Sequence, residues 1–301
     1  MFKQIITLGS LSLLAGVASA DIFPSFASPE FKYKEAGSVS GGISLDYATK
    51  YVSRDMAMSN SGTDHSVKIS AVGQYALEHR NAVLLGLSWN EIAGKGSEHY
   101  RAPICDEGTG LLELVHYFGG STALGFGYQF VHGGIPGRAN DHMAKGDASS
   151  GSPAFASDEP EEHSFVVDFH HDFTRKGLEG LFWDSRVQYA FRWVEGWWFT
   201  NTVGYKYGVA EKTDLVLSAS WTASIGYYDS GTNRTATPNA NGTQGYSVKL
   251  SAPTTLGKHF RVTPYIGTVF IGNGAEAANR RHGDVYRDFT FVAGISGSYV
   301  F

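Results

Sequence analysis

Hydrophobic and polar residues alternate along most of this 301-residue chain, in segments of about ten residues separated by turns or polar loops. The segment Thr213 to Tyr227 is the most regular: Leu215 and Leu217 fall on one side of the alternation, and Ser218 and Ser220 fall on the other. A period of two predicts β-strands, because successive side chains of a strand point to opposite faces. The same period excludes an amphipathic helix.

About twelve such segments follow Ser38. They are Val39 to Val52, His65 to Leu77, Ala82 to Ile92, Gly108 to Phe118, Thr122 to His132, Glu162 to Phe173, Phe182 to Trp193, Trp197 to Tyr207, Thr213 to Tyr227, Thr243 to Ala252, His259 to Gly272 and Tyr286 to Phe301. Strands of this length with alternate apolar residues are typical of an antiparallel up-and-down transmembrane β-barrel, which is the all-β fold we predict.

The connections between the segments also alternate in length. The short links are residues 79–81, 119–120, 174–180, 208–212 and 253–258, and the long ones are residues 53–64, 93–107, 133–161, 228–242 and 273–285. A tight hairpin at Glu195-Gly196 is the exception. Outer-membrane barrels have short turns in the periplasm and long loops outside the cell. An even number of strands then leaves both termini in the periplasm.

Aromatic residues gather near the two ends of the expected strands. Near the outer ends lie Tyr51, Trp89, Trp193, Trp197, Trp198 and Tyr227, and near the inner ends lie Tyr75, Phe118, Phe173, Trp183, Tyr205, Tyr207, Tyr299 and Phe301. Two such belts are expected where aromatic rings meet lipid headgroups. With the asymmetry of the loops, they favour a bacterial outer-membrane barrel over a secreted β-sandwich, which would also show short alternating strands.

The last segment is apolar on one face and ends at the aromatic residue Phe301. Tyr299 and Phe301 resemble the terminal strand that outer-membrane proteins present to the barrel assembly machinery. We therefore predict that they form an assembly signal, with that machinery and outer-membrane lipid as partners. An ordinary edge strand is the alternative, although a terminal strand this apolar would favour aggregation unless it closed into a barrel.

The first 20 residues have the pattern of a cleavable signal peptide: Lys3, an apolar run from Ile5 to Val17, and the triplet Ala18-Ser19-Ala20. The apolar run is shorter than the roughly 20 residues of a transmembrane helix, so export is favoured over a membrane anchor. Residues 21–37 fit neither a signal nor a strand, and we interpret them as an N-terminal periplasmic segment or a plug. Residues 38–301 remain for the barrel.

Composition narrows the function. The formal net charge is −5 without a basic cluster, which argues against a nucleic-acid partner. Cys105 is the only cysteine, so an intramolecular disulfide and a zinc site built on several thiolates are excluded. The mean hydropathy of −0.18 suits a barrel, in which only alternate residues contact lipid. We expect no cofactor.

If the apolar faces contact lipid, the other faces line the lumen. The charged residues expected there are Asp46, Lys50, Lys68, Glu113, Asp168, His170, Asp172, Asp184, Arg186, Arg192, Lys206, Lys249 and Asp288. Both signs occur, which permits either a water-filled pore or a network of paired wall residues. Barrels of about eight strands are filled by their own side chains and those of sixteen or more hold a channel, so twelve strands favour a narrow pore. The long loop from Gly133 to Glu161 could fold inward and constrict it.

The chain shows no convincing catalytic or metal-binding constellation. His170-His171-Asp172 is the densest cluster, but in a strand His171 points away from the face that His170 and Asp172 share. The His-x-Ser-Asn-Gly motif of outer-membrane phospholipases is absent. The Asp141-His142 pair lacks the Asp-Asp partner that omptin proteases carry. We therefore predict no enzymatic activity, no catalytic residue and no metal site.

The stretch Thr49-Lys50-Tyr51-Val52-Ser53-Arg54 resembles the Ser-Asp-Tyr-x-x-Arg-Gly signature in the first strand of TorF-type porins. Lys50 replaces the acidic residue and Asp55 replaces the glycine, so the tyrosine and arginine spacing carries the resemblance. It implies an outer-membrane channel and assigns no substrate.

These observations favour a porin-like channel for passive diffusion of small hydrophilic solutes. The alternative is an adhesion barrel with a blocked lumen that acts through its long surface loops. An outer-membrane hydrolase is a third hypothesis. The sequence sets neither the solute nor the oligomeric state.

Overall fold

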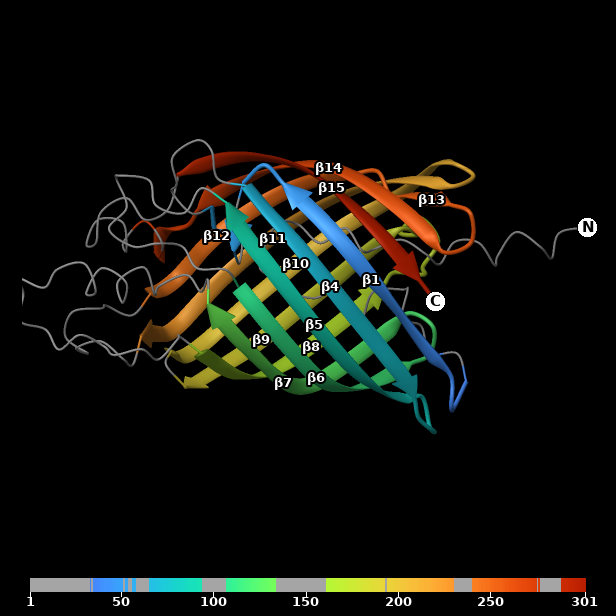
Figure 1. Ribbon diagram of the computed structural model, residues 1–301, viewed down its shortest axis with the longest axis horizontal. Helices are drawn as coiled ribbons and strands as arrows, with labels where there is room; N and C mark the ends of the chain where they lie inside the picture. The colour runs from blue at the N-terminus through green and yellow to red at the C-terminus, as the bar shows by residue number, and fades with distance from the viewer. Residues whose placement is uncertain are drawn as a thin grey trace, which may run out of the picture.

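The computed structural model describes residues 33, 35–50, 52–53, 56–57, 65–93, 107–133, 161–192, 194–229, 240–274, 276 and 288–301. Within these residues, twelve long antiparallel strands form one closed barrel (Figure 1). The all-β barrel that the sequence predicts is therefore confirmed. The expected signal peptide lies outside the described residues, as does most of the segment 21–37.

The long strands are β1 (Val39–Ala48), β4 (His65–Ala76), β5 (Asn81–Ala93), β6 (Glu107–Phe118), β7 (Thr122–Gly133), β8 (Glu161–Asp172), β9 (Leu181–Arg192), β10 (Val194–Ala210), β11 (Thr213–Asp229), β12 (Ala240–Ser251), β14 (Phe260–Ile271) and β15 (Phe289–Val300). The short strands are β2 (Val52–Ser53), β3 (Met56–Ala57) and β13 (Thr254–Leu256). Each of the segments expected from the sequence overlaps one long strand.

The barrel closes where the first long strand meets the last one. β1 pairs with β15 in antiparallel register, with Ile43 opposite Tyr299, and β10 pairs with β11. Beyond the end of β15, the Phe301 amide donates to the Gly41 carbonyl at 3.0 Å, and the Gly41 amide donates to the Phe301 carbonyl at 3.1 Å. The described long strands therefore form a ring without a free sheet edge.

The two faces of the wall differ in chemistry. On β11, Leu217, Trp221 and Ile225 are exposed on the outer face, whereas Ser218 and Ser220 are buried on the inner face. The other long strands also expose large apolar side chains on the outside of the barrel. Since the core of a bilayer is apolar, this outer face suits insertion into a membrane.

One expected belt residue lies on the other face. Trp198 is 3% exposed and lies on the inner face, while its neighbour Trp197 is 45% exposed on the outer face. The prediction that both belong to the outer belt is therefore wrong for Trp198. Strict alternation along β10 requires one of two consecutive tryptophans to point inward.

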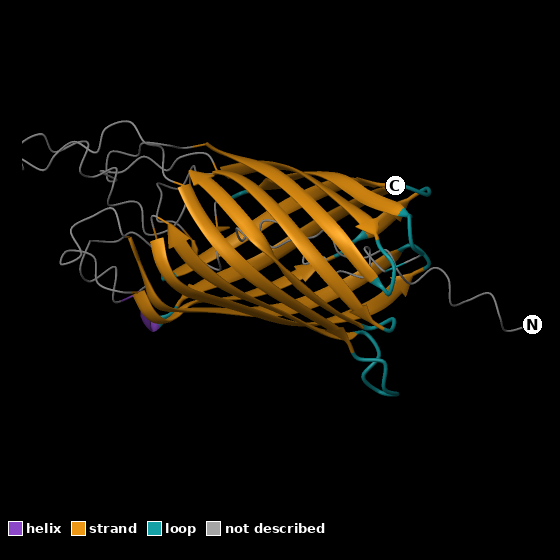
Figure 2. Cartoon of the chain, turned by 90° about the horizontal axis from the view of Figure 1, so that it is seen from below, coloured by secondary structure: helices purple, strands orange, loops and turns teal. Residues whose placement is uncertain are grey.

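The two ends of the barrel differ in their connections (Figure 2). One end, the turn end, carries the shorter links and the C-terminus; the other, the loop end, carries the longer links. At the loop end, the tight hairpin between β9 and β10 lies two residues earlier than expected, because Val194 already pairs with Arg192. Among the described residues, no helix is long and apolar enough to cross a membrane.

The first strand is shorter than the sequence predicts. β1 ends at Ala48 rather than at Val52. The Thr49 hydroxyl accepts a hydrogen bond from the Ala293 amide at 3.0 Å, and this side chain takes the place of a backbone partner in the ladder with β15. The chain then leaves the wall and forms the β2–β3 hairpin, in which Val52 pairs with Ala57.

Candidate functional site in the barrel lumen

The inner face of the wall is the candidate site. The expected lumen residues whose side chains lie on this face, buried or half-buried, are Asp46, Lys68, Glu113, Asp168, His170, Asp172, Asp184, Arg186, Lys206 and Lys249. Lys50 follows β1 and is half-buried, and Asp288 is exposed just before β15. Arg192 is the last residue of β9, and its side chain lies outside the described residues.

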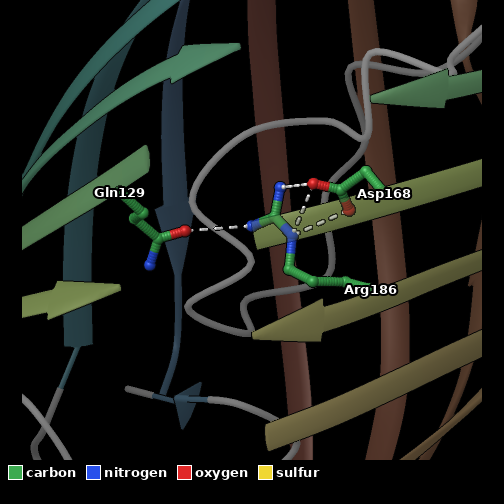
Figure 3. A network of polar contacts seen from close by, with 3 residues as sticks. All are labelled: Gln129, Asp168 and Arg186. Carbon is green, nitrogen blue, oxygen red and sulfur yellow. Dashed lines mark hydrogen bonds and ion pairs between the residues drawn. The ribbon is translucent and has the colours of Figure 1, made fainter. Parts of the chain in front are cut away.

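A buried ion pair links two neighbouring strands on the inner face (Figure 3). Arg186 on β9 lies directly opposite Asp168 on β8. Arg186 Nε donates to Asp168 Oδ1 and Nη2 donates to Oδ2, each at 2.9 Å. Arg186 Nη1 also donates to Gln129 Oε1 on β7 at 3.3 Å. The planar guanidinium thus connects three strands, and a bidentate pair of this kind fixes the register of β8 against β9.

A second polar cluster lies nearer the turn end. His170 is 3% exposed, and its Nδ1 lies 2.6 Å from Asp184 Oδ1, while its Nε2 lies 3.3 Å from Asp172 Oδ2. His171 points to the other face, where its Nδ1 lies 2.8 Å from Thr122 Oγ1. The structure therefore separates the two histidines as alternation requires. Within the described ranges, three metal-ligating side chains do not converge on one point.

Among the described side chains, carboxylates outnumber cations on the part of the inner face formed by β6, β8 and β9. This acidic sector comprises Glu113, Glu162, Asp168, Asp172 and Asp184, with Arg186 and His170 among them. Glu162 accepts hydrogen bonds from Ser164 at 2.9 Å and from Gln188. Ser164 and Gln188, which are neutral donors, therefore satisfy Glu162, and the cation Arg186 satisfies Asp168.

Small hydroxyl side chains cover the adjacent strands β11, β12, β14, β15, β1 and β4, which are consecutive in the sheet. This hydroxyl wall comprises Ser218, Ser220, Thr222, Ser224, Ser247, Ser251, Thr263, Ser296, Ser298, Ser40, Ser44, Ser66 and Ser70. Its members bond across strands, as in the 2.6 Å contact between the Ser44 and Ser70 hydroxyls. Three of the inner-face cations, Lys68, Lys249 and Arg261, stand on the same strands. The lumen-lining residues predicted from the sequence are all charged and do not include this wall, although serines at alternate positions along β11 signal it.

An apolar cluster lines the inner face of β4 to β8, where it shares β6 and β8 with the acidic sector and β4 with the hydroxyl wall. This apolar lumen cluster comprises Val72, Ala82, Leu84, Leu111, Val115, Tyr117, Ala123, Val131 and Val166. Tyr33 packs against it, with its ring centroid 6.1 Å from that of Tyr117, and donates its hydroxyl to the Leu77 carbonyl at 2.7 Å. β5 and β6 therefore carry apolar side chains on both faces.

The β2–β3 hairpin lies against the inner face at the loop end. Val52 is 2% exposed and packs in a cluster with Tyr265, Val269 and Val292, all on the inner face of β14 and β15. The backbone of β3 lies beside β14 and β12. The first long loop thus sends a hairpin into the barrel. The expected constriction by Gly133 to Glu161 lies outside the described residues.

Among the comparisons with known proteins, those with solved structures bear on the fold. No protein-family model and no curated protein matches the sequence. The chain is similar to an outer-membrane channel from Pseudomonas putida F1, with 10% identity, 90% of this chain and 98% of that chain covered, and a TM-score of 0.55. It also matches the KdgM porin, with 9% identity, coverage of 86% and 99%, and a TM-score of 0.45. LpxR from Salmonella typhimurium matches with 8% identity, coverage of 86% and 100%, and the same TM-score. The likeness to the Pseudomonas putida channel supports the barrel fold. Of the residues that carry the TorF-type resemblance, Tyr51 and Arg54 lie outside the described ones.

Proposed function

We propose that the protein is an outer-membrane channel for passive diffusion of small hydrophilic solutes, with the long loops outside the cell and both termini in the periplasm. The hydroxyl wall is the observation that carries this proposal. Serine and threonine are small, so they occupy little of the lumen, and each hydroxyl both donates and accepts hydrogen bonds. A polar solute that loses water in the barrel therefore finds replacement partners along consecutive strands.

The charges on the inner face support the same function. We propose that Asp46, Lys50, Lys68, Glu113, Asp168, His170, Arg186, Arg192, Lys206 and Lys249 line the diffusion path. The acidic sector stands on β6, β8 and β9, whereas Lys249 and Arg261 stand on β12 and β14. Solutes of either charge therefore meet a side chain of opposite charge. A lumen with charges of both signs suits small polar molecules better than it suits a single kind of ion.

A closed barrel that binds a surface partner is the second candidate. The observation behind it is the near-complete burial of inner residues such as Leu84, Val115 and Val166, each 0% exposed. Packing of this kind narrows the lumen beside β5 to β8. The hydrolase hypothesis gains nothing from His170, because both of its ring nitrogens face carboxylates.

The β2–β3 hairpin offers a direct test of the channel. We expect Val52→Ser to increase the swelling rate of proteoliposomes in isosmotic arabinose by about twofold or more, because a buried valine holds the hairpin against Tyr265 and Val269. Val216→Ser is the matched control, since Val216 is an equally buried inner valine of β11 that lies outside this cluster.

A channel that the hairpin narrows is supported if proteoliposomes with the parent protein swell faster than protein-free liposomes and only Val52→Ser increases the rate further. If the parent protein does not let arabinose pass, the closed binding barrel is favoured instead. Equal rates for the two valine variants would contradict the role given to the hairpin.

A further inference from the structure

Two histidines with the same surroundings lie on the outer face at the turn end, on consecutive pairs of strands. His116 on β6 lies directly opposite Asn81 on β5, and His171 on β8 lies directly opposite Thr122 on β7. The His116 Nδ1 is 2.9 Å from the Asn81 Oδ1, and the His171 Nδ1 is 2.8 Å from the Thr122 Oγ1. In each pair, the strand that leaves a turn provides the polar side chain and the strand that enters the next turn provides the histidine. The wall therefore repeats one arrangement side by side.

A phenylalanine two residues further along the chain completes each arrangement. Phe118 makes a T-shaped contact with His116, with ring centroids 4.5 Å apart and planes at 72°. Phe173 contacts His171 in the same way, at 4.7 Å and 84°. Each phenylalanine thus packs against one side of an imidazole. We call these four residues, His116, Phe118, His171 and Phe173, the His-x-Phe patch.

The wall holds both imidazoles of the patch through the same ring nitrogen. An amide oxygen only accepts hydrogen bonds, so the His116 Nδ1 donates to Asn81, and the Thr122 hydroxyl can accept from the His171 Nδ1 in the same way. An imidazole that donates through Nδ1 carries a second proton, on Nε2, only when it is positively charged. Among the described residues, neither Nε2 has a hydrogen-bond partner, and both histidines are half-buried rather than covered. Each protonated histidine therefore offers one charged donor to a ligand outside the wall.

The two turns beside the patch add positive charge. The exposed cations of these turns are Arg80, Arg175 and Lys176. The carboxylates of the same turns already have neighbours: the Glu78 Oε2 lies 3.9 Å from the His79 Nδ1, and Glu179 accepts a hydrogen bond from the Gly177 amide at 2.6 Å. Basic side chains near a membrane surface attract anionic lipids. The surroundings of the patch therefore favour a ligand with negative charge.

Exposed hydrocarbon adjoins the two histidines. Leu124 on β7 lies directly opposite His116, and Trp183 on β9 lies directly opposite His171. Leu114 precedes His116 on the same face of β6, and all three of these apolar side chains are exposed. A soluble phosphate would contact only the imidazoles, whereas a phospholipid also covers the apolar wall with its acyl chains. Because aromatic rings at the end of a barrel lie at the level of lipid headgroups, the patch fits the phosphate of a phospholipid.

We propose that the His-x-Phe patch binds anionic phospholipids of the leaflet at the turn end. Each protonated histidine donates from Nε2 to a phosphate oxygen, and the acyl chains lie along Leu114 and Leu124. Histidine gains its charge as the pH falls from about 8 to about 5, so binding increases over this range, whereas the arginine and lysine side chains of the turns stay charged throughout. The proposal needs only the membrane-inserted barrel and goes beyond the proposed channel.

Native mass spectrometry tests the patch on the refolded full-length barrel, released from detergent micelles that contain phosphatidylglycerol or phosphatidylcholine. At about pH 5.5 we expect the parent protein to retain phosphatidylglycerol in preference to phosphatidylcholine. The double variant His116→Asn with His171→Asn removes both imidazoles and is expected to weaken retention of phosphatidylglycerol by about fivefold or more. His65→Asn is the matched control, because His65 is an exposed histidine on the outer face of β4 at the loop end.

The pH dependence separates the imidazoles from the cations of the turns. At about pH 8 the preference for phosphatidylglycerol is expected to decrease in the parent protein and in His65→Asn, and to stay constant in the double variant. Circular dichroism checks that each variant retains its β-structure. Equal retention of the two lipids by the parent protein, or an unchanged pH dependence in the double variant, would overturn the site. Displacement of phosphatidylglycerol by glycerol 1-phosphate, which has no acyl chains, would overturn its assignment to lipid. A barrel that retains phosphatidylglycerol but does not conduct would overturn the channel and support the site.

Discussion

Removal of Phe301 is expected to lower the amount of folded barrel in the outer membrane by about tenfold, because the last residue completes the seam at which the ring closes. Its amide and carbonyl both pair with Gly41, and its ring packs over that glycine, with Phe301 Cζ 2.9 Å from the place of a Cβ. The same aromatic terminus, together with Tyr299, is the assembly signal that we propose. Quantifying the heat-modifiable folded form in outer-membrane fractions checks the expectation.

Two controls distinguish the roles of Phe301. Phe301→Tyr retains an aromatic ring and both backbone hydrogen bonds, so it is expected to assemble at near-normal levels. Leu256→Ala removes another exposed apolar side chain of the turn end, away from the seam, and is expected to have little effect. If the variant that lacks Phe301 fails in cells but refolds normally in detergent, the residue acts mainly through the assembly machinery. Normal levels of that variant in cells would contradict both roles.

Replacement of Arg186 by methionine is expected to lower the free energy of unfolding by about 3–5 kcal/mol, because it strands a buried carboxylate without its cation. Asp168 is 2% exposed and would lose all of its hydrogen bonds from Arg186, while the carboxyl group of Glu113 lies nearby. Urea unfolding of the refolded barrel in lipid vesicles measures the change.

The chain offers a matched control for this substitution. Lys206 pairs with Asp214 at 3.2 Å, but its side chain is 19% exposed, so Lys206→Met is expected to cost about 1 kcal/mol or less. The double variant Asp168→Asn with Arg186→Met removes both charges of the buried pair and is expected to recover part of the loss. An Arg186→Met protein as stable as Lys206→Met would show that the buried pair does not fix this wall.

The fold could be predicted from the sequence because a closed wall between two different media imposes one rule at every position. Leu217 must face one medium and Ser218 the other, and this rule needs only local sequence. The alternation of short and long connections then distinguishes the two ends of the barrel. The belt prediction for Trp198 is wrong because alternation requires that one of Trp197 and Trp198 point inward, but only the register of β10 decides which one.

Which side chains contact one another in the lumen is harder to predict than which side chains face it. Asp168 and Arg186 were both expected on the inner face, but their contact depends on the register that the turn between β8 and β9 sets. Predicting that Glu113 lies near Asp168 requires the registers of β6, β7 and β8. It also requires knowing that Gly125 and Gly127 lie between the two carboxyl groups, and glycine gives no signal in a pattern of apolar and polar residues.

The inward hairpin was missed for a different reason. Val52 continues the alternation of the first segment, so pattern alone assigns it to the strand. In the alternation, however, Val52 falls on the same side as Ser44 and Asp46, which are inner positions. A valine does not match these polar neighbours. An apolar residue on a polar face was the available signal that this segment leaves the wall and packs elsewhere. Leu84 and Leu111 of the apolar lumen cluster are also apolar residues at inner positions, but they remain in the wall.

Planar-bilayer recording on the purified, refolded protein tests the channel most directly. Insertion of the barrel into a bilayer bathed in symmetrical potassium chloride is expected to give discrete, repeatable conductance steps, and Val52→Ser is expected to give larger steps than Val216→Ser. A protein that is folded by circular dichroism and inserted in the bilayer, yet produces no conductance step, would contradict the account of the lumen as a diffusion path.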